Sequence, residues 1–200
     1  MSQQICNNCP YDIEVYCSKR NIPKCNVTRE ELQEQLIQAI RELYEKDYYL
    51  IEKGLYETCV VAHILRYFTN KYFQDYSEYS IDMEYSKNGN SPKNYLPPGE
   101  QYTNRREMPL ARPDMIIHNR GCNYHNFVYI EFKGWWNNRN SGQYDDENKL
   151  KIFTDQNDSS EFAYKFVYGI SIKLNKKGVR FKWFKDGEYI PEWDYSPRMI

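Results

Sequence analysis

The spacing of the apolar residues changes part way along the chain, and this change constrains the fold more than any other feature. Up to about residue 75 the apolar side chains recur at helical intervals, whereas from Tyr79 to Tyr85 they alternate with polar ones. A period of two is typical of a strand that buries one face. The chain is therefore expected to begin with helices and to continue into a sheet.

The individual elements follow from the same pattern. Thr28 and Glu31 match a capping box that predicts a helix from about 29 to 50, and a second helix is expected from 55 to just before 75. Strands are expected at 79–85, 113–118, 127–133, 166–174 and 179–184, a helix at 146–154, and a long loop at 87–112. The order αα-βββ-α-ββ predicts an α/β or α+β domain in which helices flank a mixed sheet.

Size and composition exclude several classes of protein. With 200 residues, 40% of them apolar and 28% charged, the chain suits one domain with a small appendage and differs from disordered or fibrous proteins. Its longest apolar runs, such as Cys59–Ala62, are far shorter than a membrane span, and the first residues do not resemble a secretion signal. We therefore expect a soluble, cytoplasmic protein without a membrane partner. A net charge of −1 argues against a polycation that coats nucleic acid by charge alone.

Four cysteines lie in the first 25 residues, and we treat residues 1–27 as a Cys-rich segment that precedes a domain at 28–200. Four thiolates can close a tetrahedral zinc site, but only the first pair has the C-x-x-C spacing of a zinc ribbon. A structural zinc ion, an iron–sulfur cluster, disulfides and unligated thiols are all open for Cys6, Cys9, Cys17 and Cys25. Cys59 and Cys122 stand alone in apolar stretches and are predicted to be core residues.

Charged residues at the ends of two predicted strands indicate a site. Asp114 opens one strand, and Glu131 and Lys133 close the next. Residues two apart share a face of a strand, so Glu131 and Lys133 project together, and Asp114 meets them if the two strands form a hairpin. Adjacent carboxylates repel unless a cation lies between them, and Mg²⁺ or Mn²⁺ accepts such oxygen ligands together with water. On spacing alone, a strand-start aspartate with exposed edge charges is an equal alternative.

Four stretches of the sequence match a known family: GLYETCVVAHILRYF with Glu57, RPDMIIHNRG with Asp114, NFVYIEFKG with Glu131 and Lys133, and DDENKL with Asp146, Lys149 and Leu150. Together they resemble the motifs of the PD-(D/E)XK nuclease superfamily. The similarity spans residues 55 to about 174 and extends to small uncharacterised members with a Glu-Tyr dipeptide on the first strand, here Glu84-Tyr85. It implies a restriction-endonuclease-like fold.

The resemblance also implies a Mg²⁺- or Mn²⁺-dependent deoxyribonuclease, with endonuclease activity favoured. Carried over from the family, Asp114 and Glu131 bind the metal with the Phe132 carbonyl, Lys133 positions the nucleophile, and Glu57 orients a water molecule or adds a metal ligand. DNA is the expected partner, RNA is an alternative, and the motifs are compatible with a homodimer or a targeting subunit. The rival hypothesis is a non-catalytic nucleic-acid-binding adaptor that uses a zinc-bound Cys cluster and a basic hairpin.

The last predicted hairpin is basic on one side. Apolar residues at 179, 181 and 183 alternate with cations, which should therefore share the opposite face. This face is expected either to contact a phosphate backbone or to be a solvated edge protected by lysines. The candidate nucleic-acid-binding residues are Lys149, Lys173, Lys176, Lys177, Arg180 and Lys182. Base stacking and capping of the core are both open for Trp135 and Trp136, and the predicted role of His63, His118 and His125 is structural.

Overall fold

The computed structural model describes residues 25–77, 79–88, 91–97, 99–102, 104, 107–120, 126–137, 140–158 and 163–200. The predictions for Cys6, Cys9, Cys17, Cys122 and His125 lie outside the described residues. Cys25 is described: it is partly buried, and its backbone N–H donates to the Tyr79 hydroxyl (3.0 Å).

The described helices before the sheet are α2 (Arg29–Lys46), α3 (Tyr48–Lys53) and α4 (Glu57–Tyr72), followed by the 3₁₀ turn η1 (Phe73–Tyr76). The predicted capping box is present, because Thr28 accepts from the Glu31 N–H (3.2 Å) and Glu31 accepts from the Thr28 N–H (2.8 Å). The single helix predicted at 29–50 is wrong, since Asp47 separates α2 from α3. The Asp47 carboxylate contacts His63 and Tyr67 on α4, a tertiary contact that no local pattern reveals.

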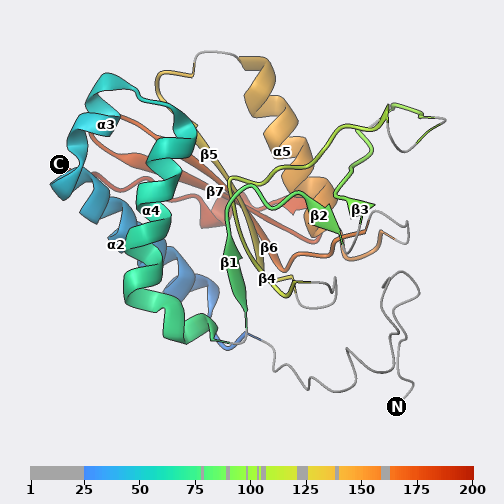
Figure 1. Ribbon diagram of the computed structural model, residues 1–200, viewed down its shortest axis with the longest axis horizontal. Helices are drawn as coiled ribbons and strands as arrows, with labels where there is room; N and C mark the ends of the chain where they lie inside the picture. Colours follow the sequence, from blue (N-terminus) through green and yellow to red (C-terminus); the bar gives the residue numbers. More distant parts are fainter. Residues whose placement is uncertain are drawn as a thin grey trace.

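The strands of the main sheet are β1 (Ser80–Asp82), β4 (Met115–His118), β5 (Val128–Gly134), β6 (Tyr168–Leu174), β7 (Val179–Lys185) and β8 (Glu188–Tyr189). This six-stranded sheet has the order β1-β4-β5-β6-β7-β8, and a separate ribbon pairs β2 (Lys87–Asn88) with β3 (Ser91–Pro92). Only β5 and β6 run parallel among the neighbouring pairs of the described sheet. Helix α5 (Asn140–Thr154) joins these two strands, and the 3₁₀ turn η3 (Pro191–Trp193) follows β8 (Figure 1).

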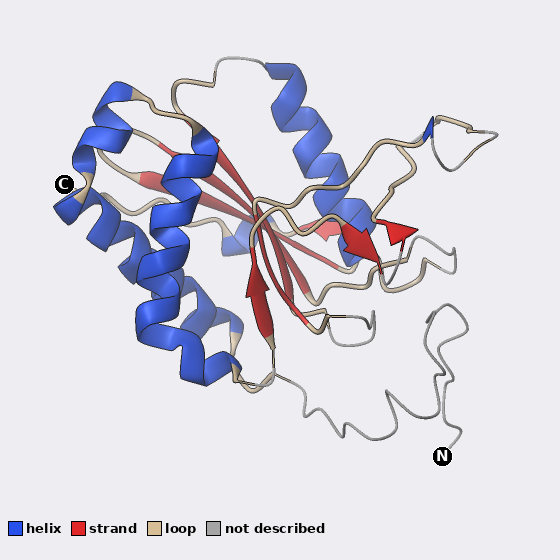
Figure 2. Ribbon diagram, viewed as in Figure 1, coloured by secondary structure: helices blue, strands red, loops and turns tan. Residues whose placement is uncertain are grey.

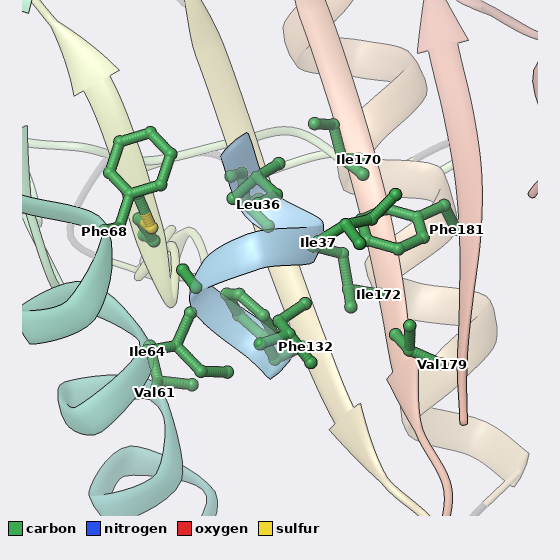
Figure 3. Packing of buried hydrophobic residues seen from close by; sticks show 14 of the residues in the cluster. Leu36, Ile37, Val61, Ile64, Phe68, Phe132, Ile170, Ile172, Val179 and Phe181 are labelled. Carbon is green, nitrogen blue, oxygen red and sulfur yellow. The ribbon is translucent and has the colours of Figure 1, made fainter. Parts of the chain in front are cut away.

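Helices cover both faces of the sheet (Figure 2). On one face α2 and α4 pack against the strands in the larger apolar cluster, which includes Ile64, Phe132 and Ile172 (Figure 3). On the other face α5 packs against β5 in a smaller cluster that includes Leu150 and Tyr129. Burial of one such side chain stabilises the fold by about 1.5–3 kcal/mol. The prediction of a mixed sheet flanked by helices is therefore confirmed.

Several predicted boundaries are wrong. The first strand is shorter than 79–85, because Glu84 takes a left-handed backbone conformation (φ 47°) and the Glu84-Tyr85 pair lies beyond β1. α5 begins at Asn140, before the helix predicted at 146–154, which shows tertiary context overriding local propensity. β6 begins at Tyr168 instead of residue 166.

The prediction that Cys59 lies in the core is also wrong, because this residue is exposed. On α4 the buried positions are Val60, Val61, Ile64, Tyr67 and Phe68. A helix can turn only part of its surface toward a sheet, so the apolar run at 59–62 buries Val60 and Val61 and leaves Cys59 and Ala62 exposed. None of the helices in the described part of the chain has the length and apolar character that a bilayer span requires.

Candidate active site

Asp114 and Glu131 stand opposite each other on neighbouring segments. The β4–β5 register pairs Met115 with Ile130, so the next pair outward is Asp114 with Glu131. The Phe132 N–H donates to the Asp114 carboxylate (2.7 Å), which holds that side chain across the end of the pair. The hairpin expected from the sequence thus brings the two carboxylates together.

Both carboxylates are shielded from water, and this shielding disfavours their ionisation. Burial raises the pKa of Asp114 to about 6, and the charge of Glu57 adds to this effect. Glu131 is 3% exposed. Burial, together with the charges of Asp114 and Asp146, raises its pKa well above the ordinary value. Its Oε1 atom has no hydrogen-bond partner among the described residues, a state that costs roughly 1–3 kcal/mol.

Lys133 projects from the same face of β5 as Glu131. Its Nζ atom lies 2.9 Å from Asp146 Oδ2 and 3.3 Å from Glu57 Oε1. Burial by itself would lower the pKa of Lys133, but the contact with Asp146 and the charges of the nearby carboxylates outweigh it and raise this pKa above its ordinary value. These contacts favour the protonated, cationic form of Lys133 at neutral pH.

Helix α4 begins at Glu57, and this start brings the glutamate to the end of β5. Its Oε2 atom accepts from the Gly134 N–H (3.1 Å) and from the Asn137 side chain (2.6 Å), while Oε1 faces Lys133. A carboxylate in a first helical turn also interacts favourably with the positive helix end. Glu57 therefore ties α4 to the loop after β5 and orients Lys133 from one side.

Helix α5 brings two further charged residues to the site. Asp146 is 6% exposed, and its carboxylate lies between the ammonium groups of Lys133 and Lys149. Lys149 lies 3.1 Å from Asp146 and 3.0 Å from Asp145. Burial opposes protonation of Lys149, but the charges of Glu131 and Asp146 raise its pKa above the ordinary value. Sequence reasoning missed that Asp146 contacts Lys133; the only signal was the spacing of Asp146 and Lys149, which share a helix face.

The two tryptophans after β5 hold the following loop against the helices. Trp135 donates from Nε1 to the Ile51 carbonyl at the end of α3 (2.9 Å). The Trp136 ring covers Gly134 so closely that an added Cβ atom there would lie 2.3 Å from it, and therefore only glycine fits. Of the two interpretations of these tryptophans, this packing favours capping of the core.

The face of the sheet that carries Glu131 also carries Lys173, Arg180 and Lys182. Arg180 pairs with Asp194 (3.0 Å), and Lys182 pairs with Glu147 on α5 (2.7 Å). The hairpin also carries three exposed lysines, Lys173, Lys176 and Lys177. The basic face expected from the alternation is thus present, with two of its cations already paired to acids.

Both described histidines have an acidic partner that the sequence does not reveal. His63 lies 2.8 Å from Asp47, and His118 lies 2.9 Å from Asp82. Burial lowers the pKa of His118, although the contact with Asp82 opposes this effect. These pairs connect secondary-structure elements away from Asp114, which agrees with a structural role.

A second lysine is buried outside the site. Lys93 is 2% exposed, and its ammonium lies 5.1–5.6 Å from the ring centroids of Tyr85, Tyr164 and Phe166. Burial lowers the pKa of Lys93 to about 7, and the charge of Asp82 compensates only in part. The sequence places this lysine in a loop and gives no sign of its burial.

The donor set at Asp114 and Glu131 fits a hard divalent cation. In the described part of the chain, no three His, Cys, Asp or Glu side chains are grouped so as to hold one ion. Mg²⁺ is commonly bound by one or two carboxylates and completes its shell with water and substrate oxygens, so two carboxylates suffice. The unpartnered Glu131 oxygen is where such an ion would relieve the repulsion between the two acids.

Comparison of the chain with protein-family models, with curated proteins and with solved structures finds no match.

Proposed function

We propose that the protein is a divalent-metal-dependent nuclease that hydrolyses phosphodiester bonds in DNA. The convergence of Asp114, Glu131 and Lys133 at one end of the β4–β5 hairpin supports this most strongly. A pair of buried acids with raised pKa values lowers the stability of the fold, and such costs are concentrated at functional sites. The lysine beside them supplies the positive charge that an anionic substrate requires.

In this proposal Asp114, Glu131 and the Phe132 carbonyl hold Mg²⁺ or Mn²⁺. A bound ion of this kind neutralises charge on a phosphodiester and lowers the pKa of a coordinated water molecule. The contribution of the protein is to keep two carboxylates ionisable and adjacent at the end of a rigid strand pair. The raised pKa of Asp114, about 6, still leaves its carboxyl group mostly ionised at neutral pH.

Lys133 then stabilises the negative charge that grows on the phosphate in the transition state. Glu57 and Asp146 contact its ammonium from two sides, so the group is oriented before substrate arrives. Loss of one positioned donor of this type slows a reaction by about 10²–10³-fold. Glu57 and Asp146 thus act through Lys133 as positioning residues.

The test is to incubate the purified protein with supercoiled, linear and single-stranded DNA and with RNA, in Mg²⁺, in Mn²⁺ and in EDTA. We expect DNA cleavage that depends on the metal. Asp114→Asn and Glu131→Gln should each abolish cleavage, because each removes a proposed metal ligand without changing side-chain size. Glu34→Gln is the matched control, since Glu34 is an exposed carboxylate on α2.

Cleavage that persists in EDTA, or in both ligand variants, would contradict the proposal. Cleavage of RNA alone would keep the chemistry and change the substrate. A wild-type protein that binds nucleic acid but cuts none of these substrates would favour the non-catalytic adaptor instead.

A further inference from the structure

The three central strands β5, β6 and β7 build the α5-facing side of the sheet in layers. Strand register places Tyr129 beside Gly169 and Phe184, Glu131 beside Ser171 and Lys182, and Lys133 beside Lys173 and Arg180. The first layer is apolar and is covered by α5. The second layer is mixed, and its Lys182 pairs with Glu147 on α5. The third layer consists of three cations.

The two cations of this third layer that lie farther from the acidic pair are more exposed than Lys133. The side chain of Lys133 is 24% exposed and that of Arg180 is 52% exposed, while Lys173 between them is also exposed. Lys133 is held by Asp146 and Glu57, and Arg180 is held by Asp194. Within the described part of the chain, Lys173 has no acidic partner of this kind.

Protection of a sheet edge does not account for these cations. Lysines often protect the open edge of a sheet from pairing with another chain. Lys173, however, lies on β6, which pairs with a strand on each side, and Arg180 on β7 lies next to the bridge between Phe181 and Tyr195. The row is therefore a charged surface over interior strands.

We propose that Lys133, Lys173 and Arg180 form a binding row for the phosphodiester backbone of the substrate strand. This inference rests on the proposed function and extends it by giving the strand a path away from the scissile bond, across β5, β6 and β7. Neighbouring strands are about 4.8 Å apart, so long side chains of the row can adjust to successive phosphates. Such contacts position a nucleic acid without reading its sequence, and the row accordingly predicts little sequence preference.

Binding measurements separate this row from the chemistry. All protein variants in this experiment also carry Asp114→Asn, which blocks the proposed cleavage. Their affinity for labelled single-stranded and duplex DNA is measured in Mn²⁺ over a series of salt concentrations. RNA of the same sequence is tested in the same way. Lys173→Gln should weaken DNA binding about fivefold and lower the slope of log affinity against log salt by about 0.7 to 0.9. Lys173→Arg should restore both values, because it keeps the charge.

Lys71→Gln is the matched control, since Lys71 is an exposed lysine at the far end of α4 from Glu57. It should leave affinity and salt slope unchanged. Thermal melting of the Lys173 variants should match that of the parent, as expected for an exposed side chain. Three results would each contradict the proposed binding role of the row. They are unchanged DNA affinity and salt slope in Lys173→Gln, no recovery of affinity in Lys173→Arg, and no binding of either DNA by the parent protein.

The two proposals can fail separately. If the protein cuts no nucleic acid but Lys173→Gln still weakens binding, the row is supported and the nuclease proposal falls. If the wild type cuts DNA in a metal-dependent way but Lys173→Gln changes neither binding nor KM, the nuclease is supported and the row falls. A response of RNA alone would overturn the assignment of the row to DNA.

Discussion

Lys133 and Lys93 are both shielded from solvent, but the side chains around their ammonium groups differ in kind. Carboxylates of Asp146 and Glu57 surround Lys133 and raise its pKa despite the opposing effect of burial. Aromatic rings surround Lys93, and burial lowers its pKa to about 7. Rings attract a cation through their quadrupoles, but they replace only part of the hydration that the charge loses.

These different surroundings determine which interactions each lysine can make. Lys133 remains charged and oriented next to two acids whose own burial is unfavourable, which is the arrangement that an anionic substrate needs. Lys93 fills space among the rings of Tyr85, Tyr164 and Phe166, and the acid whose charge reaches it is Asp82 of β1. Burial alone therefore does not set the charge of a lysine; the chemistry of its neighbours does.

The largest expected effect is on cleavage. Lys133→Met should lower kcat for DNA by about 10³-fold while DNA binding falls only a few fold, because the lost charge acts mainly in the transition state. Lys71→Met, on the exposed end of α4, should cut at the wild-type rate. Single-turnover cleavage in Mn²⁺ measures both variants. A cleavage rate of Lys133→Met within tenfold of wild type would show that the charge of Lys133 is not needed for cleavage.

Lys93→Met should do the opposite and raise stability at neutral pH. The folded-state pKa of about 7 lies below the unfolded value of roughly 10.4, so the fold bears the full cost of the charge below pH 7. This cost falls as the pH rises from 7 to about 10. The variant should exceed wild type by on the order of 4 kcal/mol at pH 6.5 and by much less at pH 9.5. Urea unfolding at both pH values measures this, and a destabilised variant at pH 6.5 would show that the rings fully compensate the charge.

Asp114→Asn should also raise stability, and here the gain comes at the expense of function. The folded-state pKa of about 6 exceeds the unfolded value of roughly 3.9, so the cost of the ionised group is complete above pH 6 and disappears as the pH falls toward 4. We expect a gain of about 2–3 kcal/mol at pH 7 in EDTA and almost none at pH 4. Mn²⁺ should then stabilise wild type and leave the variant unchanged. An equal Mn²⁺ effect on both chains would place the ion elsewhere.

The smallest expected effect is the coupling between Lys93 and one of its rings. A double-mutant cycle of Lys93→Met and Phe166→Leu should give a coupling of about 0.5–1 kcal/mol at pH 6, where the lysine is charged. The coupling should vanish at pH 9, where the lysine is neutral. Coupling of the same size at both pH values would mean that the ring and the lysine interact by packing and not by charge.

Much of the fold and the core of the candidate site follow from local pattern. The strands at 115–118 and 128–134 are short, apolar and close in sequence, so their pairing and the meeting of Asp114 with Glu131 need only one hairpin. The capping box at Thr28 is equally local. Such features are predictable because each depends on a few neighbouring residues.

The remaining features depend on contacts between distant segments. Asp146 meets Lys133 only because α5 crosses from β5 to β6, and Lys93 is buried only because the chain brings it against rings at 85, 164 and 166. Asp47 ends α2 through its contacts with α4. Helical periodicity carries no information about such partners, and this is why the sequence predicts Lys149 only as a candidate nucleic-acid-binding residue and gives no sign of the burial of Lys93.

The parallel pairing of β5 and β6 makes the chain leave the sheet at Gly134 and return at Tyr168. Asp146 lies on α5, in the segment between these two strands. Lys133 therefore gains its shortest ionic contact only after α5 has packed against the sheet. A nascent or partly unfolded chain would therefore carry the acidic pair without an oriented lysine. In this way the topology makes the orientation of Lys133 a property of the finished molecule, absent from its incomplete forms.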